Sequence, residues 1–459
     1  MFIKLIRVFS VKHFILKLII LTKGGRILRN KSRLPKYLYG PLAMRTVSAA
    51  VSMLLLSLFI PTVSPAVSLS GDSSTYVQSR EAADSSKILG VYEYLDFAVQ
   101  NIGNETISFH TGGWLRYDLK EEEFRKRSNS DLQYSYLSFK SKTDNTVVNL
   151  GRVMVFEGVA AERVDGLYAR TDLMAGFGIS GFGGSPVETG SDIPGNNVIY
   201  GGRLSHQYGD VYRIGISALK EEKDSQDYRR EEGIDIWVHP IQKVDLTGRS
   251  SYNDVTKGWM EQSYALMLGP FEKLRLNATA SWIDYDNYFF RTTMSAFTLQ
   301  SGLIQPNEKV RTLGGEASYP ITDQVLITVD YKNFTYDIAG KADYIGGKVK
   351  YSLTGSGGAG IGYHAMVGDT DKLKYNEYRV YAYKKFGHLD VSADVIDVAY
   401  VNEINGVKDS YTGSLAAQYD IAEAWKLGAD VEYSHNPDFD KDIRVFFKVL
   451  YHFGAKGGA

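Results

Sequence analysis

Residues 442–453 read DIRVFFKVLYHF, and this stretch decides the fold. Every second residue from Ile443 is apolar: Ile443, Val445, Phe447, Val449, Tyr451 and Phe453. The positions between them mix charged and apolar residues: Arg444, Phe446, Lys448, Leu450 and His452. A period of two predicts a β-strand. A strand with one wholly apolar face and one charged face predicts an apolar environment on one side and water on the other.

The same alternation recurs along the chain, in LRLNATASW (274–282), VLITVDY (325–331), YTGSLAAQY (411–419) and WKLGADVEY (425–433). Short turns are predicted at Lys142–Asn145, Gln207–Asp210, Pro240–Lys243, Pro270–Lys273, Pro320–Gln324, Gly387–His388 and Ile421–Ala424. Longer polar loops are predicted between them, at 119–131, 184–197, 220–233 and Tyr285–Lys309. Short turns at one end and long loops at the other are typical of a transmembrane β-barrel.

The fold class predicted is therefore all-β, a transmembrane antiparallel β-barrel of about 20 strands (range 18–22) over residues 105–453. Short turns face the periplasm and long loops the exterior. An even number of strands places both chain ends in the periplasm, including the tail 454–459. GVYEYLDFAVQ (90–100) reads as one further strand that would break this parity. We therefore expect 67–104 to be a periplasmic or lumenal segment.

The first residues predict export. Residues 44–66, MRTVSAAVSMLLLSLFIPTVSPA, combine a basic start, an apolar stretch and small residues at the end, which predicts a cleaved secretory signal. Residues 1–43 are interpreted as a mis-annotated extension, or alternatively as a basic amphipathic segment at a membrane surface. The first 71 residues hold 11 Lys and Arg and no acidic residue, so the remainder carries 41 basic against 53 acidic side chains, a net charge of −12. This balance gives no indication of nucleic-acid binding.

Charged residues on the polar faces are the candidates for lining a pore. If the apolar faces contact lipid, these side chains point into the lumen, where fixed charges of both signs favour some ions over others. Alternatively, they only pair with one another. The candidates are Arg116, Arg203, Arg213, Arg249, Arg275, Asp235, Asp245, Lys348, Lys350, Asp430 and Glu432.

The loop Tyr285–Lys309 is the longest, and its middle is apolar. We expect it to fold into the mouth as a constriction, although it could equally cap the rim or contact a partner. The candidate constriction residues are Phe289, Phe290, Met294 and Phe297.

No catalytic, metal-binding or cofactor-binding residues are predicted. The chain has no Cys, and none of its eight His pairs with another at metal-ligand spacing. The glycine-rich runs GFGISG (176–181) and GSGGAG (355–360) are not followed by a helical pattern, as phosphate binding would require.

LGRVMVFEGVAAERVDGLYARTDL (150–173), GGRLSHQ (201–207) and the C-terminal strand resemble porin-like outer-membrane barrels of Gram-negative bacteria, most closely the group found in metal-reducing bacteria. The resemblance implies a passive outer-membrane channel for ions or small hydrophilic solutes. Implied partners are outer-membrane lipid, lipopolysaccharide and the barrel-assembly machinery. The alternative function is the sheath of a porin–cytochrome electron conduit, which requires partner multihaem cytochromes and a lumen clear of inward loops. An outer-membrane hydrolase is a third candidate, without a residue spacing that indicates it.

Overall fold

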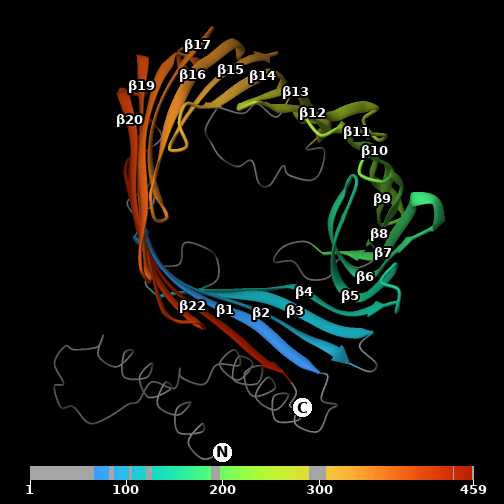
Figure 1. Ribbon diagram of the computed structural model, residues 1–459. Coiled ribbons are helices and arrows are strands. Elements are labelled where there is room, and N and C mark those ends of the chain that lie inside the picture. The colour runs from blue at the N-terminus through green and yellow to red at the C-terminus, as the bar shows by residue number, and fades with distance from the viewer. Residues whose placement is uncertain are drawn as a thin grey trace, which may run out of the picture. The chain divides into compact units, whose positions relative to one another are not determined.

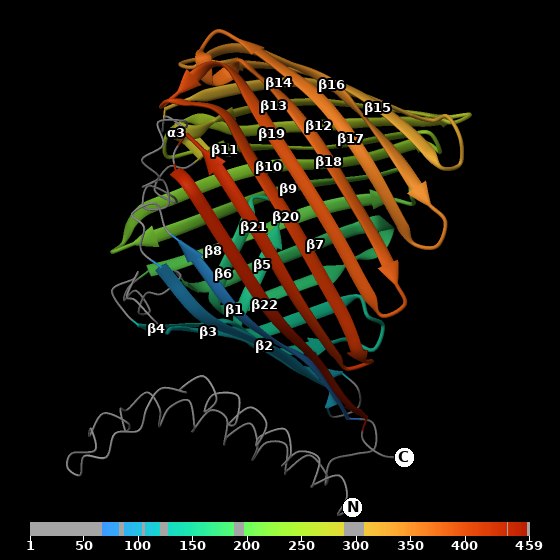
Figure 2. The same ribbon diagram turned by 90° about the vertical axis from the view of Figure 1, so that its left-hand side faces the viewer.

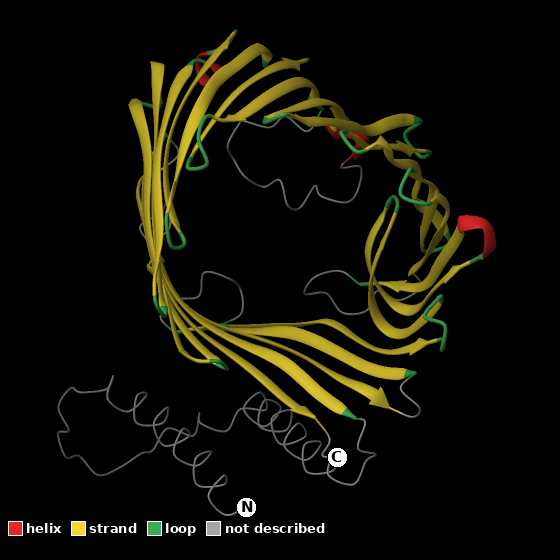
Figure 3. Ribbon diagram, viewed as in Figure 1, coloured by secondary structure: helices red, strands yellow, loops and turns green. Residues whose placement is uncertain are grey.

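The computed structural model describes residues 67–81, 87–102, 106–119, 127–187, 197–288, 307–437 and 439–456, all within one compact unit, Ser64–Ala459. These residues form almost entirely β-strands (Figure 3). The predictions for residues 1–66 lie outside the described residues. No helix in the described part of the chain is long and apolar enough to cross a membrane.

The first eleven strands are β1 (Ser68–Glu81), β2 (Lys87–Ile102), β3 (Ile107–Asp118), β4 (Ser128–Lys140), β5 (Thr146–Glu157), β6 (Ala160–Asp172), β7 (Phe177–Pro186), β8 (Asn197–Tyr208), β9 (Tyr212–Lys223), β10 (Gln226–Ile241) and β11 (Val244–Asn253). The other eleven are β12 (Gly258–Phe271), β13 (Leu274–Asp284), β14 (Lys309–Pro320), β15 (Val325–Tyr336), β16 (Gly340–Leu353), β17 (Gly357–Gly368), β18 (Tyr375–Phe386), β19 (Leu389–Ile404), β20 (Val407–Ala422), β21 (Trp425–Asn436) and β22 (Phe439–Lys456). The described ranges also contain three single helical turns, η3 (Met174–Gly176), α3 (Tyr285–Tyr288) and η4 (Asp371–Leu373).

The sheet closes on itself. Each strand pairs antiparallel with the next along the chain, and β22 pairs with β1, from Ser68 opposite Lys456 to Arg80 opposite Arg444. The strands surround a lumen and run obliquely between the two ends of the ring (Figures 1 and 2). The all-β antiparallel barrel is therefore confirmed, with 22 strands where about 20 were predicted.

The two additional strands come from the segment placed wrongly by the sequence. Residues 68–81 and 87–102, expected in the periplasm or lumen, are β1 and β2 of the wall. The outward positions of β1 hold small and hydroxyl residues, among them Gly71, Ser73 and Thr75, so this strand lacks an apolar face. Because two strands were missed rather than one, each predicted turn and loop still lies at the end of the barrel where it was predicted.

The two ends of the barrel differ in part as predicted, because the loop end also has two-residue turns, for example Asn405–Gly406 between β19 and β20. We call the end where β1 begins and β22 ends the terminal end, and the opposite end the loop end. All the predicted short turns lie at the terminal end, for example Gly387–His388 between β18 and β19. The predicted long loops all fall at the loop end. The tail prediction needs correction, because β22 continues past Phe453 to Lys456.

One predicted loop, 220–233, is instead the end of the β9–β10 hairpin. The strands continue to Lys223 and from Gln226, joined by Asp224 and Ser225 with φ of 50° and 63°. Two residues with positive φ form the tight turn that matches strand twist. The charged residues of this hairpin show no apolar alternation that would predict strands, but they form ion pairs between the two strands: Lys220 contacts Asp227 at 2.8 Å.

The apolar side chains that face outward are unusually exposed. Phe447, Leu415 and Val431, on three adjacent strands, are 57%, 55% and 46% exposed. Contiguous apolar surface of this kind requires an apolar surrounding. The charged positions between them lie on the inner face, as the alternation predicted.

Candidate functional site

The β5–β6 hairpin leaves the barrel wall and turns into the lumen (Figure 1). Pairing of β5 with β4 covers only Val147–Arg152, and pairing of β6 with β7 begins only at Val164. Between these points, β5 and β6 pair with each other alone, up to Glu157 opposite Ala160. The segment 153–163, which we call the infolded hairpin, therefore stands inside the ring.

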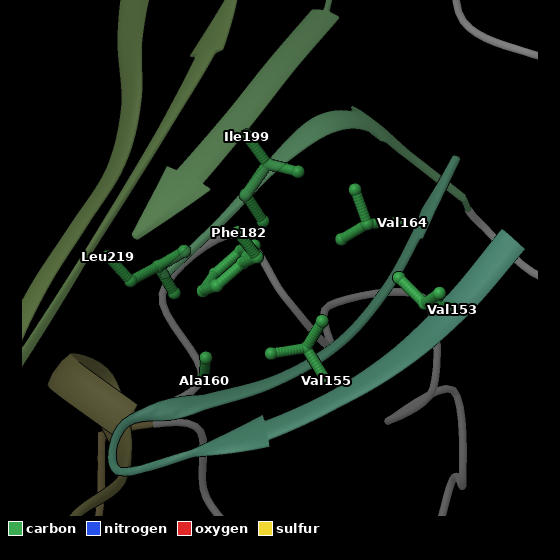
Figure 4. Close-up of a cluster of buried hydrophobic side chains, with 7 residues drawn as sticks. All are labelled: Val153, Val155, Ala160, Val164, Phe182, Ile199 and Leu219. Atoms are coloured by element: carbon green, nitrogen blue, oxygen red, sulfur yellow. The ribbon is translucent and has the colours of Figure 1, made fainter. Parts of the chain in front are cut away.

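An apolar cluster holds the infolded hairpin against the inner wall. Val153, Val155 and Ala160 of the hairpin are at most 3% exposed. They pack with Val164 at its base and with three inward side chains of the wall: Phe182 on β7, Ile199 on β8 and Leu219 on β9 (Figure 4). Burial of this kind stabilises by about 25 cal/mol for each Å² of apolar surface removed from water. The hairpin is thus packed against the inner wall like a small protein core.

Polar contacts fix the tip of the hairpin. The Val159 amide donates a hydrogen bond to Ser217 Oγ on β9 at 3.0 Å. Gly158 has φ +61°, and a Cβ at this position would lie 2.1 Å from Ser217 Oγ. Glycine is required here both by its backbone conformation and by the close approach of the wall. Glu157 accepts a hydrogen bond from Tyr168 Oη at 2.6 Å.

Buried ion pairs connect the hairpin to the wall on both sides. Glu162 pairs with Arg229 of β10, whose guanidinium also lies 2.8 Å from Glu231 and 3.9 Å from Glu221. Arg229 and Glu231 are each 5% exposed. On the other side, Arg163 pairs with Asp131 of β4. Removing one partner of a buried pair leaves an uncompensated charge, so this network holds the hairpin in one position.

The opposite face of the hairpin carries exposed apolar side chains. Met154 and Phe156 are 48% and 69% exposed, while their neighbours Val153 and Val155 are buried. Because the buried face lies on the wall, Met154 and Phe156 project away from it into the lumen. Beside the tip is a cavity of about 270 Å³, lined by Glu162, Arg229, Arg249 and Glu261, and by Tyr288 of α3 among others.

Most of the predicted pore-lining residues are engaged with opposite charges. Arg116 contacts Asp118 at 3.5 Å, Arg203 contacts Asp235 at 2.6 Å, Arg249 contacts Glu261 at 2.7 Å, Lys348 contacts Glu316 at 3.6 Å, Lys448 contacts Asp430 at 3.4 Å, and Arg444 contacts Glu432 at 3.5 Å. Asp245 lies 3.6 Å from the imidazole of His239. Arg213 donates to Gln207 Oε1, Lys350 lies over the Tyr383 ring, and Arg275 is exposed. Their effect on ion passage stays a prediction.

Three of these residues, Arg203, Asp235 and Arg249, lie together on the wall beside the hairpin, because Asp235 is opposite Arg249 in the pairing of β10 with β11. Arg203 and Asp235 form a bidentate pair on the wall beneath it, and Arg203 also lies 4.0 Å from Glu157 at the hairpin's end. The candidate constriction residues Phe289, Phe290, Met294 and Phe297 lie outside the described residues. The described start of that loop, α3, is held by Asn287, which donates to the Trp259 carbonyl at 3.2 Å.

The infolded hairpin was missed by the sequence analysis, although it lies in the stretch that carried the resemblance. Residues 153–156 read VMVF, apolar at four successive positions. A barrel strand with water on its inner face alternates apolar and polar residues, whereas positions 153 and 155 are also apolar here because they pack against the wall. That local loss of alternation was the available signal.

A hydrolytic site and a metal site find no support among the described residues. Ser108 lies 2.8 Å from His110 Nε2 on β3, but no hydrogen bond in this part of the structure brings a carboxylate to His110 to complete a triad. No group of three or more His, Asp or Glu in the described ranges is arranged to hold a metal ion.

Comparison with solved structures places the architecture. The ferric enterobactin receptor of Pseudomonas aeruginosa superposes with a TM-score of 0.52, at 10% identity, over 85% of this chain and 82% of that one. The fold is that of outer-membrane β-barrel proteins. OccAB4 of Acinetobacter baumannii matches over 86% of this chain and all of its own, with a TM-score of 0.44 and 10% identity. No protein-family model and no curated protein sequence matches the chain.

Proposed function

We propose that the protein is an outer-membrane channel for the passive diffusion of ions and small hydrophilic solutes. The observation that carries the proposal is the infolded hairpin, which narrows a closed barrel whose inner face also carries the charged side chains described above. A wall that is apolar outside and polar inside suits lipid outside and water inside. Because its own apolar cluster and ion pairs fix the hairpin in place, the hairpin would set the width of the pore at this level.

Several finer expectations belong to this proposal. The signal at 44–66 would direct export, and the strands would be inserted by the barrel-assembly machinery. Outer-membrane lipid and, at the loop end, lipopolysaccharide would surround the exposed apolar belt. Membership of the porin-like group of metal-reducing bacteria stays a prediction, as does a constriction by the loop 285–309.

The alternative, a sheath around a multihaem cytochrome, is less well supported. A sheath requires a lumen clear of inward segments, whereas the hairpin occupies part of it. The hairpin is also anchored by the buried Arg229–Glu162 pair, so its displacement by a partner would break a desolvated network.

Single-channel recording of the purified protein in planar lipid bilayers tests the proposal. Stable current steps support a diffusion channel, and folded protein that never conducts would refute it. The geometry also sets the expected effect of deleting residues 154–162. Strands about 4.8 Å apart and tilted by about 40° give a 22-strand circumference of about 140 Å and, inside the side chains, a lumen of roughly 900 Å². A two-strand hairpin covers roughly 100 Å² of it, so conductance should rise by about a tenth.

A further inference from the structure

The inner wall of β22, β1, β2, β3 and β4 carries a contiguous row of aromatic side chains, which we call the aromatic band. Its members are Phe446, Tyr76, Tyr92, Tyr94, Trp114 and Tyr134. The cross-strand register places them side by side: Tyr76 is opposite Tyr92, and Tyr94 is opposite Trp114. Their positions alternate with outward apolar residues such as Phe447 and Phe97, so the band faces the lumen.

The rings are held so that they offer surface to the lumen. Tyr134 lies over Gly112, where a Cβ would come within 2.6 Å of its ring, and Tyr92 lies over Gly90, where a Cβ would come within 2.9 Å. Because glycine has no side chain, the neighbouring ring can lie flat against the sheet, with one face toward the lumen. Tyr76 and Tyr94 meet edge to face, with centroids 5.6 Å apart. A hollow of about 360 Å³ is lined by Tyr76, Tyr92, Tyr94, Gln78 and Phe446.

Hydrogen-bonding side chains border the band on both sides. Toward the terminal end, Asp72 and Asp96 lie opposite each other on β1 and β2. Toward the loop end, Asn129 on β4 lies opposite Arg116 of β3, whose own guanidinium is buried beside Asp118. Lys448 lies opposite Tyr76. Acidic and basic groups are thus mixed along the border, which favours a neutral solute over an ion.

We propose that the aromatic band is a binding track for saccharides passing through the channel, an inference that rests on the proposed function. A pyranose ring has flat faces of C–H groups and hydroxyls around its rim. The faces stack on aromatic rings, while the rim hydroxyls bond to carboxylate, amide and ammonium groups beside them. Five strands about 4.8 Å apart make the band roughly 19 Å wide, which accommodates about four hexose units.

The test uses the full-length protein and maltohexaose, with maltose as the short probe. Current blocking in planar bilayers measures binding inside a conducting pore. Intrinsic tryptophan fluorescence of the detergent-solubilised protein, with Trp114→Phe to identify the responding residue, measures binding without conduction. We expect maltohexaose to block the current and to change the Trp114 emission, with an affinity about tenfold above that of maltose because it covers more rings.

Substitutions test the stacking surface itself. Tyr94→Leu should weaken maltohexaose binding about tenfold, while Tyr94→Phe, which keeps the ring, should change it less than about threefold. The matched control is Tyr383→Leu, a lumenal tyrosine over Gly358 on a distant strand, which should have no effect. Equal affinity in Tyr94→Leu and wild type would overturn the proposal.

Further outcomes separate this inference from the proposed function. A conducting protein that maltohexaose neither blocks nor perturbs refutes the saccharide track and leaves the channel intact. Fluorescence binding by a protein that never conducts supports the track and refutes the channel. Blocking by benzoate or choline in place of maltohexaose would reassign the band to aromatic solutes or cations, and so would overturn the saccharide proposal.

Discussion

The substitution Leu219→Ala should release the infolded hairpin while leaving the barrel folded. Leu219 is 2% exposed and lies on β9, beneath the hairpin residues of the apolar cluster. Truncating a buried leucine to alanine costs about 2–5 kcal/mol. Here the cost falls on hairpin packing, because the β9 backbone stays paired with β8 and β10. At 1.4 kcal/mol per factor of ten, the released state should become roughly 30 to 4,000 times more populated.

Cysteine labelling measures that population, because the chain has no native cysteine. A cysteine introduced by Val155→Cys replaces a side chain that is 1% exposed, so a thiol reagent reaches it only when the hairpin leaves the wall. A cysteine introduced by Phe156→Cys, at a position 69% exposed, gives the labelling rate without protection. Leu219→Ala should accelerate labelling at 155 toward that limit and leave the rate at 156 unchanged.

The control is Leu204→Ala, a leucine on the outward face of β8 that is 43% exposed and does not contact the hairpin cluster. It should leave labelling at 155 unaltered. If Leu219→Ala also leaves it unaltered, in a protein that keeps the electrophoretic mobility of a folded barrel, the cluster does not hold the hairpin and the reasoning fails.

Three other predictions concern the same region and the pore. Arg229→Met leaves Glu162, Glu221 and Glu231 without their common partner, so the labelling rate at position 155 should rise by a factor equivalent to about 3–5 kcal/mol. The control Arg230→Met, at a half-exposed position, should change that rate little, and equal effects of the two variants would contradict the role of burial. Gly158→Ala should displace the hairpin because its Cβ would meet Ser217, whereas Gly209→Ala should not, because Gly209 has a similar φ of +51° but no atom near the added Cβ. The single-channel current should therefore change in Gly158→Ala and stay at the wild-type level in Gly209→Ala. Because most predicted pore-lining charges are paired, the cation-to-anion permeability ratio from reversal potentials in a salt gradient should lie roughly within threefold of unity, and a ratio above tenfold would show that the pairs do not cancel.

The class of fold, and the end of the barrel at which each predicted turn or loop lies, followed from the sequence because they depend on repeated, redundant signals. Alternation on one strand is confirmed by the next, and turn length tells the ends apart. The strand count failed at β1, where the outward row Gly71–Ser73–Thr75 lacks the apolar signal that the other strands share. Once β1 was missed, parity forced β2 out of the barrel as well.

The site depended on contacts that periodicity does not record. Charged lumenal residues such as Arg203 and Asp430 were recognised one by one, but their partners lie on other strands and appear only once the register is known. Predicting the hairpin would have required more weight on the four successive apolar residues 153–156 than on the alternation seen in the other strands. The aromatic band needed both missed strands, since Tyr76, Tyr92 and Tyr94 come from β1 and β2.

The pairing of β1 with β22 has a consequence for biogenesis. Asp72 and His452 touch across this seam although 380 positions separate them, so the ring cannot close until the last strand has been delivered. Until then, both edges are unpaired, and assembly must shield them from other chains. Of the thirteen pairs in the seam, three use Gly454, Ala455 and Lys456, beyond the terminal aromatic residue. Residues 454–456 thus extend the closing contact of the barrel, and a chain cut after Phe453 would have to close on ten pairs.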